Sequence, residues 1–389
     1  MAILDGIRRG QSAAADPVQA ARDFHRAVAQ PGGGGLVCFF CSTAYPLDIL
    51  GAELARLFAG THLIGCTTAG EIGPSGYMDG SISGFSIPRH AGFATSTLIP
   101  GLSAFRMSEG HAAAEAALAA FMRGTGAPVD PTKTFALLLS DGMAANEEPL
   151  VAAIHSRMGN VPLVGGSAGD DLRLKRSFVY HDGRFHPDAA LLTMVRTSYP
   201  FRICRTQHFY ASDVKMVVTS ADPVARTVSE INAEPAAVEY ARIAGLDVRQ
   251  LTPIVFAEHP VMVRVGGACH VRSIQRLNED GSLTFFCAID EGVVLTLARR
   301  EDIVHNLERF FGRVRQELGA PQLVIGFDCI LRSVEAENMQ CKHRLSRLLS
   351  SNNVIGFCTY GEQHGAMHVN QTFTSVVIGQ PAGASADHA

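Results

Sequence analysis

The sequence contains no apolar stretch of 18 residues, which excludes a membrane-spanning helix. It also has no long run of Lys and Arg, and its formal net charge is -4, so neither a nucleic-acid partner nor a membrane surface is predicted. The first residues lack the charged and apolar regions of a secretory signal. Nine scattered cysteines, an odd number, are typical of a reducing compartment, and the predicted location is therefore the cytoplasm.

Several short motifs of cofactor and metal sites are also missing. There is no Walker loop, no Gly-x-Gly-x-x-Gly that opens a helix and no His-Glu-x-x-His. The spacing Cys-x-x-Cys-His is absent, so any haem would be held non-covalently. Cys38 and Cys41 form a Cys-x-x-Cys without a second pair at zinc-finger spacing, which predicts buried structural thiols and no metal site. The glycine run 32–35 precedes a strand and indicates a linker.

The sequence does contain a phrase that occurs three times. It consists of a short apolar run, small residues, a glycine and a carboxylate. The copies are residues 63–71 (LIGCTTAGE), 163–170 (LVGGSAGD) and 354–362 (VIGFCTYGE). Three copies indicate that one supersecondary unit is used three times in the chain.

Each phrase closes a longer repeat of helix, strand, helix and strand. Apolar residues recur at helical spacing in the helical segments, as Val18, Ala21 and Phe24 do. The strand runs are short and continuously apolar, as expected for strands covered on both faces. Ahead of the phrases, the expected segments are 16–29, 36–40 and 47–59 in the first copy, 112–122, 135–139 and 148–158 in the second, and 301–318, 323–327 and 337–349 in the third.

This order predicts an α/β fold in which repeated units form mixed sheets. A strand, a crossover helix and a second strand normally make a right-handed parallel pair. Ligands of such sheets bind beyond the carboxyl ends of the strands, where Glu71, Asp170 and Glu362 are expected. The alternative interpretation is that the glycines of the phrase only permit tight turns.

The predicted organisation has two domains. Residues 1–204 contain two copies of the unit, and residues 205–380 contain an α+β section followed by the third copy. The last residues, 381–389, are expected to be a disordered tail.

Catalytic chemistry is not predicted. Residues 165–169 spell the Gly-x-Ser-x-Gly of a nucleophile elbow, but the same slot holds Thr or Cys in the other two copies, so a hydrolase is not expected. The histidines are the remaining residues that could form a functional site. His208, His259 and His368 are candidate haem or metal ligands, and the alternative for each is a hydrogen-bonded structural histidine.

The three phrases, with the closing Asn370-Gln371-Thr372, resemble FIST proteins, which are sensory input modules with N- and C-terminal FIST domains. The C-terminal FIST domain typically has a Cys-x-x-Arg strand end, matched by residues 329–332, and an Arg-Ser-Ile before an Asp-Gly turn, matched by residues 272–274 and 280–281. The resemblance extends from about residue 20 to residue 380 and is closest to the stand-alone nitric-oxide-sensing members. The matching details are residues 206–209, 286–290, 361–363 and 367–372.

This resemblance implies a cytoplasmic bacterial sensor without catalytic activity. Such a protein binds haem b non-covalently, senses nitric oxide and regulates in trans a partner histidine kinase or an enzyme that makes or degrades cyclic-di-GMP. His208, His259 and His368 are the candidate axial ligands because they fall inside matching stretches.

Two other hypotheses stay open. In the first, an amino-acid-like ligand binds at the strand-end turns, where Glu71, Arg272 and Glu362 would meet its charged groups. Cys358, Tyr360 and Asn370 are further residues expected to line such a pocket. The second is a thiol or metal switch that uses Cys66, Cys287, Cys329 or Cys358.

Overall fold

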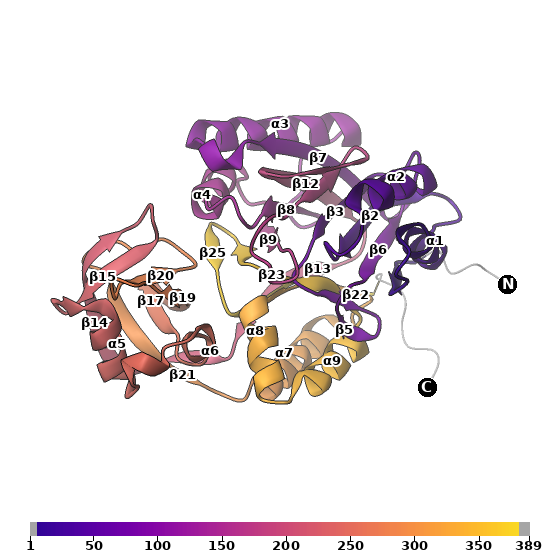
Figure 1. The fold of residues 1–389 in the computed structure, drawn as a ribbon. Coiled ribbons are helices and arrows are strands. Elements are labelled where there is room, and N and C mark those ends of the chain that lie inside the picture. The colour runs from indigo at the N-terminus through magenta and orange to yellow at the C-terminus, as the bar shows by residue number, and fades with distance from the viewer. Residues whose placement is uncertain (1–5, 381–389) are drawn as a thin grey trace.

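The computed structural model describes residues 6–380, and the predicted disordered tail, 381–389, lies outside these residues. Figure 1 shows a larger body, in which three α/β units surround a common core, and a smaller body formed by residues 209–300. We call the smaller body the inserted domain because it lies between the first strand of the third unit and the rest of that unit.

The elements of the three units follow one another in the same order, apart from additions. Unit 1 (8–88) contains β1 (Arg8–Ser12), α1 (Pro17–Val28), β2 (Gly34–Cys41), α2 (Leu47–Leu57), β3 (Leu63–Thr67), β4 (Glu71–Gly73), β5 (Gly76–Met78) and β6 (Ile82–Pro88). Unit 2 (92–197) contains β7 (Gly92–Pro100), the 3-10 helix η1 (Leu102–Ala104), α3 (Met107–Thr125), β8 (Thr134–Asp141), α4 (Glu147–Arg157), β9 (Leu163–Ala168), β10 (Val179–His181), β11 (Arg184–His186) and β12 (Ala189–Thr197). Unit 3 (201–207 and 303–378) contains β13 (Phe201–Gln207), α7 (Ile303–Leu318), β22 (Leu323–Cys329), α8 (Ile330–Asn338), α9 (Lys342–Ser351), β23 (Val354–Thr359), β24 (Glu362–His364), β25 (Met367–Val369) and β26 (Thr372–Ile378).

Each unit builds a six-stranded sheet on one plan. Four strands come from the unit itself, in the order β1-β6-β2-β3, β7-β12-β8-β9 or β13-β26-β22-β23, and the last two of each order run parallel. A hairpin from another unit completes each sheet: β10-β11 extends the first, β24-β25 the second and β4-β5 the third. Because every unit gives a hairpin to one neighbour and receives one from the other, the three units interlock in a ring.

The inner faces of the three sheets pack into one apolar core. Phe40 of β2, Leu137 of β8 and Phe357 of β23 are fully buried in it, and the rings of Phe40 and Phe357 lie 4.8 Å apart. The helices cover the outer faces, where Phe24 of α1 and Ile154 of α4 are also fully buried. Burial on both faces explains why these strands are continuous apolar runs in the sequence.

The inserted domain has its own eight-stranded sheet and its own core, around Met216, Tyr240 and Phe256. Its strands are β14 (Phe209–Asp222), β15 (Thr227–Ile231), β16 (Glu234–Pro235), β17 (Val261–Val265), β18 (Ala268–Arg272), β19 (Ile274–Leu277), β20 (Leu283–Phe285) and β21 (Val294–Arg300). Its helices are α5 (Ala236–Ala244), η2 (Val248–Gln250) and α6 (Pro253–Glu258). The chain enters and leaves this domain on the same side, through β14 and β21, which pair with each other.

The predicted α/β fold with mixed sheets and repeated units is confirmed, and so are the parallel strand pairs. The single helix predicted for residues 337–349 is wrong. The structure has two helices there, α8 and α9, and α8 already begins at Ile330. The helices separate because Gln340 adopts a left-handed φ of 53°, which a continuous helix does not accommodate.

The predicted boundary between residues 204 and 205 falls within β13, a strand of the sheet of unit 3, and the boundary stays a prediction. Among residues 6–380, no helix has both the length and the hydropathy needed to cross a membrane.

Candidate functional site

The three repeated turns meet at one place, where they are hydrogen-bonded to one another. The turn of unit 1 pairs with that of unit 3, since Ala69 N donates to Cys358 O (3.1 Å) and Cys358 N donates to Gly70 O (2.8 Å). The turn of unit 2 contacts both of the others: Gly169 N donates to Thr67 O (3.1 Å), and Tyr360 N donates to Ser167 O (3.2 Å). The predicted strand-end position of the turns is therefore correct, and the ring of units brings all three together.

The carboxyl groups of units 1 and 3 are enclosed in the same way. Glu71 accepts hydrogen bonds from Ser81 N (3.0 Å) and Ser81 Oγ (2.6 Å) and contacts Thr68 Oγ1. Glu362 accepts from Thr359 Oγ1 (2.7 Å), Thr372 N (3.1 Å) and Thr372 Oγ1 (2.7 Å). Both side chains are fully buried, and this burial raises the pKa of each to about 8 despite the hydrogen bonds. At neutral pH both groups are mostly protonated and belong to the packed interior, so they are not free to bind a ligand.

The carboxyl group of unit 2 has different surroundings. Asp170 accepts from the backbone N–H groups of Leu174 (2.8 Å), Lys175 (2.6 Å) and Arg176 (2.9 Å), and from Tyr360 Oη (2.5 Å). Burial alone would raise the pKa of Asp170, but these hydrogen bonds outweigh it and lower the pKa below its ordinary value. Asp170 is therefore ionised, and it organises the segment that follows it.

That segment, residues 171–177, has a strained backbone. Asp171, Leu172 and Leu174 adopt left-handed φ values of 54°, 62° and 52°, which are unusual for leucine. The Asp171 carboxylate fixes the start of the segment to unit 1, because it accepts from Thr43 N (3.0 Å) and Thr43 Oγ1 (2.6 Å). A strained segment held by two carboxylates is a candidate for a functional element.

A cavity of about 290 Å³ lies beside this segment, between unit 2 and the inserted domain. Its lining includes Glu147, Leu174, Arg226, Gln275, Arg276, Phe286 and Tyr360. The cavity is at the carboxyl ends of β8 and β9, which is where ligands bind in open α/β sheets.

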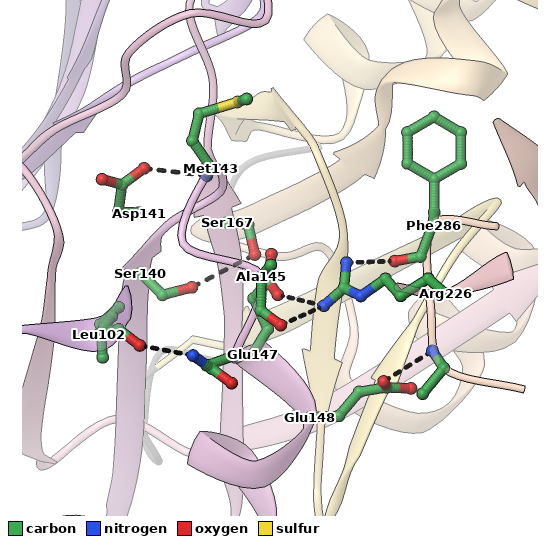
Figure 2. A network of polar contacts seen from close by, with 12 residues as sticks. Leu102, Ser140, Asp141, Met143, Ala145, Glu147, Glu148, Ser167, Arg226 and Phe286 are labelled. Atoms are coloured by element: carbon green, nitrogen blue, oxygen red, sulfur yellow. Dashed lines mark hydrogen bonds and ion pairs between the residues drawn. The ribbon is translucent and has the colours of Figure 1, made fainter. Parts of the chain in front are cut away.

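Arg226 joins the two sides of this cavity. Figure 2 shows its guanidinium donating to Phe286 O (2.8 Å) within the inserted domain, and to Ala145 O (2.7 Å) and Glu147 Oε2 (2.8 Å) in unit 2. Glu148, the next residue of α4, accepts from Ala288 N (2.9 Å). Burial would lower the pKa of Arg226, but the nearby Glu147 outweighs it and raises the pKa, so this cation remains charged. The inserted domain is thus attached to unit 2 by charge-assisted hydrogen bonds, which are stronger than neutral ones.

His368 lies at the same interface. Its side chain is buried against Gly361, where a Cβ would overlap with the imidazole ring. Burial lowers the pKa of His368 to about 4, so the ring is neutral, and its Nδ1 has no hydrogen-bond partner among the described residues. Arg272 of the inserted domain donates to His368 O (3.4 Å). Asn370, just after β25, also has a buried side-chain oxygen without a partner in the described part of the chain.

The other two predicted histidines have different environments. His208 is fully buried, with Nε2 2.8 Å from Glu335 Oε2 and Nδ1 2.8 Å from Arg332 Nη1, so both ring nitrogens are engaged. Burial is the main cause that lowers the pKa of His208. His259 is only partly buried, and its Nδ1 lies 3.2 Å from Val255 O. His208 and His368 therefore differ in their hydrogen bonding, although both lie in stretches that resemble the same family.

The four cysteines proposed for a thiol switch are all buried. Burial raises the pKa of the Cys66, Cys329 and Cys358 thiols well above the ordinary value and that of Cys287 to about 12. Because the thiolate is the reactive and metal-binding form, these environments disfavour a switch. No group of three His, Cys, Asp or Glu side chains among residues 6–380 has the arrangement of a metal site.

Of the predicted pocket residues, Tyr360 lines the cavity, and Arg272 donates to His368 O of β25. Glu71, Cys358 and Glu362 are enclosed in the turns instead. The sequence reasoning missed Arg226, Glu147 and Glu148. Two acidic residues at the start of a helix are common because they complement its dipole, and the Arg lies in a turn of another domain, so no local signal joins them.

Comparison with known proteins establishes the family. The profile of the FIST N domain matches residues 35–234, and that of the FIST C domain matches residues 236–364. The chain therefore belongs to the FIST family, and it is a sensory protein of signal transduction. No curated protein matches it significantly.

Two solved structures resemble the chain over nearly its whole length. A cyanuric acid hydrolase from A. caulinodans has 11% identity and a TM-score of 0.42, with 97% of this chain and 99% of that chain covered. Another cyanuric acid hydrolase has 9% identity and a TM-score of 0.37, with 96% and 99% covered. The prediction that the chain has no catalytic activity is corrected on this finding, because both structures are enzymes. A likeness of this degree assigns no reaction to the chain.

Proposed function

We propose that this FIST protein senses nitric oxide through non-covalently bound haem b in the cytoplasm, and that it regulates a partner histidine kinase or a cyclic-di-GMP-making or -degrading enzyme in trans. The observation that carries the proposal is the environment of His368. A neutral imidazole with an unpartnered, buried nitrogen is the form in which histidine binds iron. His368 would hold the haem, and the haem iron would supply the position at which nitric oxide binds.

His368 is favoured over the other two candidates by its hydrogen bonding. Ligation by His208 would break its contact with Arg332 or with Glu335 in a fully buried network. His259 is partly exposed and lies at the end of α6, away from the repeated turns in the sequence. For His368 no existing hydrogen bond of Nδ1 has to be broken.

The contacts of residues 367–371, which include His368 of β25, supply a route for the signal. Arg272 of the inserted domain donates to His368 O (3.4 Å), and Ala257 O accepts from the Gln371 side-chain amide (3.2 Å). A ligand that shifts residues 367–371 would alter how the inserted domain packs on unit 2, where Arg226 and Glu147 hold it. A two-state change in that packing would present a different surface to the partner.

Absorption spectroscopy of the haem-loaded protein tests the proposal. We expect a Soret band that shifts when nitric oxide is added, and we expect His368→Ala to lose or change that band. His259→Ala is the matched control and should keep the wild-type spectrum. A wild-type protein without a Soret shift would overturn nitric-oxide sensing, and an unchanged His368→Ala spectrum would overturn the ligand assignment.

The cavity supports a second candidate, the binding of a small amino-acid-like ligand. Its volume of about 290 Å³ is close to the lower limit of small-molecule pockets. Arg276 lines it and has no ion-pair partner among the described residues, so a ligand carboxylate could pair with this cation. Tyr360 and Gln275 offer polar groups on the same lining.

A thermal-shift screen with amino acids, on the haem-free protein, tests this second candidate. We expect a raised melting temperature with the correct ligand and a loss of that shift in Arg276→Gln. Arg264→Gln, at an exposed position of β17, is the matched control. An equal shift in both variants would place the ligand elsewhere.

A further inference from the structure

The opposite end of the ring of units holds a second, larger cavity with a volume of about 700 Å³. It lies where β2 and β8 begin and β12 ends, and its lining includes His62, just ahead of β3. The repeated turns follow the carboxyl ends of β3 and β9, so this cavity and the candidate site are at opposite ends of the parallel strands.

The charged side chains that line this cavity are all basic. Arg89, Lys133 and Arg196 line it, together with His62 and His90, and no Asp or Glu is among its lining residues. Within residues 6–380, none of these three cations forms an ion pair with a carboxylate. Three unneutralised cations around one hollow raise the local concentration of anions.

Gly34 and Gly35, part of the glycine run 32–35 that the sequence indicated to be a linker, line the cavity, and Gly33 contacts Arg89. Gly33 has a φ of 84°, and the Arg89 guanidinium lies 3.4 Å from the position that a Cβ of Gly33 would take. Arg89 N donates to Gly33 O (3.2 Å), and Arg89 Nη2 donates to Gly60 O (3.3 Å). A Cβ on Gly35 would overlap with Gly92 O, so the glycine lets two backbones meet here. The exposed guanidinium of Arg89 is thus hydrogen-bonded to a backbone carbonyl at the rim of the cavity.

The other side of the cavity is also fixed. His62 Nε2 lies 2.8 Å from Ser96 Oγ, and Ser96 Oγ lies 2.7 Å from Thr193 Oγ1, so the imidazole is tied to β7 and β12. Burial is the main cause that lowers the pKa of His62 to about 4, so it is a neutral hydrogen-bonding group there. Arg196 lies on β12, where it is paired with Phe93 of β7, and its side chain is half-buried.

We propose that this cavity, the basic cavity, binds a phosphorylated small molecule. Its volume lies within the range of small-molecule sites. Two guanidinium groups and an ammonium group suit an anion with several charges, and the planar fork of arginine matches the oxygens of a phosphate. Because the basic cavity is at the far end of the strands from His368, it is a second site, independent of the proposed haem function.

Isothermal titration calorimetry at low ionic strength, on the full chain without haem, tests this inference. The probes are pyrophosphate, ATP and, as a phosphate-free polyanion, citrate. We expect pyrophosphate or ATP to bind the wild type, and we expect Arg89→Gln with Arg196→Gln to weaken binding about tenfold or more. Arg123→Gln with Arg313→Gln removes the same charge from exposed helix positions and should bind like the wild type. His368→Ala should also bind like the wild type, which separates this result from the fate of the haem proposal.

Three results would overturn the inference: no binding of either phosphate compound, equal binding by the Arg89 and Arg196 double variant, or binding of citrate alone. The melting temperature of each variant shows whether it folds. Should the double variant not fold, Lys133→Gln replaces it, because the Lys133 side chain is exposed and its loss does not disturb packing. Weaker binding of the phosphate compounds by Lys133→Gln supports the site, and unchanged binding contradicts it.

Discussion

The turns of units 1 and 3 and the turn of unit 2 share a sequence phrase but hold their carboxyl groups in opposite protonation states. Glu71 and Glu362 are enclosed by hydroxyl groups of their own units, and burial raises the pKa of each to about 8. Asp170 is bound by backbone N–H groups and by Tyr360 of unit 3, and its pKa is lowered. The same position therefore holds a neutral acid twice and a carboxylate once.

The difference follows from two small residues in unit 2. Ala168 occupies the position of Thr68 in unit 1 and Thr359 in unit 3. Ala189, at the start of β12, occupies the position where units 1 and 3 have the hydroxyl groups of Ser81 and Thr372. Without these hydroxyls, the carboxyl group of Asp170 lacks the side-chain partners that Glu71 and Glu362 have within their own units. It binds outward instead and shapes residues 171–177, which border the cavity of the inserted domain. The comparison teaches that the carboxyl groups of units 1 and 3 belong to the packed interior, whereas Asp170 organises residues beside the cavity.

Among the single substitutions, the largest effect is expected from Asp170→Ala. Loss of a buried carboxylate leaves three N–H groups and Tyr360 Oη without their acceptor, which should lower the free energy of unfolding by about 3 kcal/mol. Urea denaturation measures it. Asp130→Ala, in an exposed turn where Asp130 also accepts from a backbone N–H, is the control and should cost much less stability than Asp170→Ala. Equal losses in the two variants would show that Asp170 has no special role.

The second effect is a dependence of stability on pH that Glu71 and Glu362 impose. Between the ordinary pKa of 4.5 and the folded value of about 8, the folded state holds two protons that the unfolded state has released. Raising the pH across this range therefore favours unfolding, by about 1.4 kcal/mol per pH unit for each proton.

Thermal or urea denaturation between pH 5 and pH 9 measures this slope. The variant with Glu71→Gln and Glu362→Gln keeps neutral hydrogen-bonding groups and should show a flatter profile than the wild type. Asp170 acts in the opposite direction, because its lowered pKa contributes stability that is lost only as the pH falls through that value. A wild-type stability that rises steadily from pH 5 to pH 8 would contradict the protonated state of the two glutamates.

A smaller effect is expected from Tyr360→Phe. This change removes one hydrogen bond to the Asp170 carboxylate (2.5 Å) and should lower the free energy of unfolding by about 1.5–3 kcal/mol, the usual range for a hydrogen bond to a charged group. Tyr180→Phe is the matched control, since Tyr180 Oη donates to a neutral acceptor, Gly51 O (2.9 Å), and its loss should cost about 1 kcal/mol. Urea denaturation compares the two, and a larger loss in Tyr180→Phe would reverse the order that the account requires.

Much of the fold could be predicted from the sequence because the repeated phrase marks a local unit. Strand, helix and strand follow from apolar runs and helical spacing, and the parallel pairing follows from the crossover. The exchange of hairpins could not be predicted, because β4, β10 and β24 pair with strands that are far away in the sequence. The residues of these three strands do not indicate which strand each one pairs with.

Less of the candidate site could be predicted. The repeated phrase located Asp170 and Tyr360, but it also predicted that Glu71 and Glu362 would meet a ligand. Their burial and protonation depend on residues that come together only in the fold. Arg226 was missed for a related reason: its acceptors, Ala145 and Glu147, are about 80 residues away in the chain and belong to another body. Which of three matching histidines has a free nitrogen is likewise a property of tertiary packing.

The central claim is that the ligand binds where unit 2 meets the inserted domain, and hydrogen–deuterium exchange with and without haem tests it most directly. We predict that haem protects residues 142–148, 272–288 and 367–371, and that the turn of unit 1, residues 68–81, exchanges as before. Protection of residues 68–81 to the same extent, or no protection in any of these segments, would contradict the account.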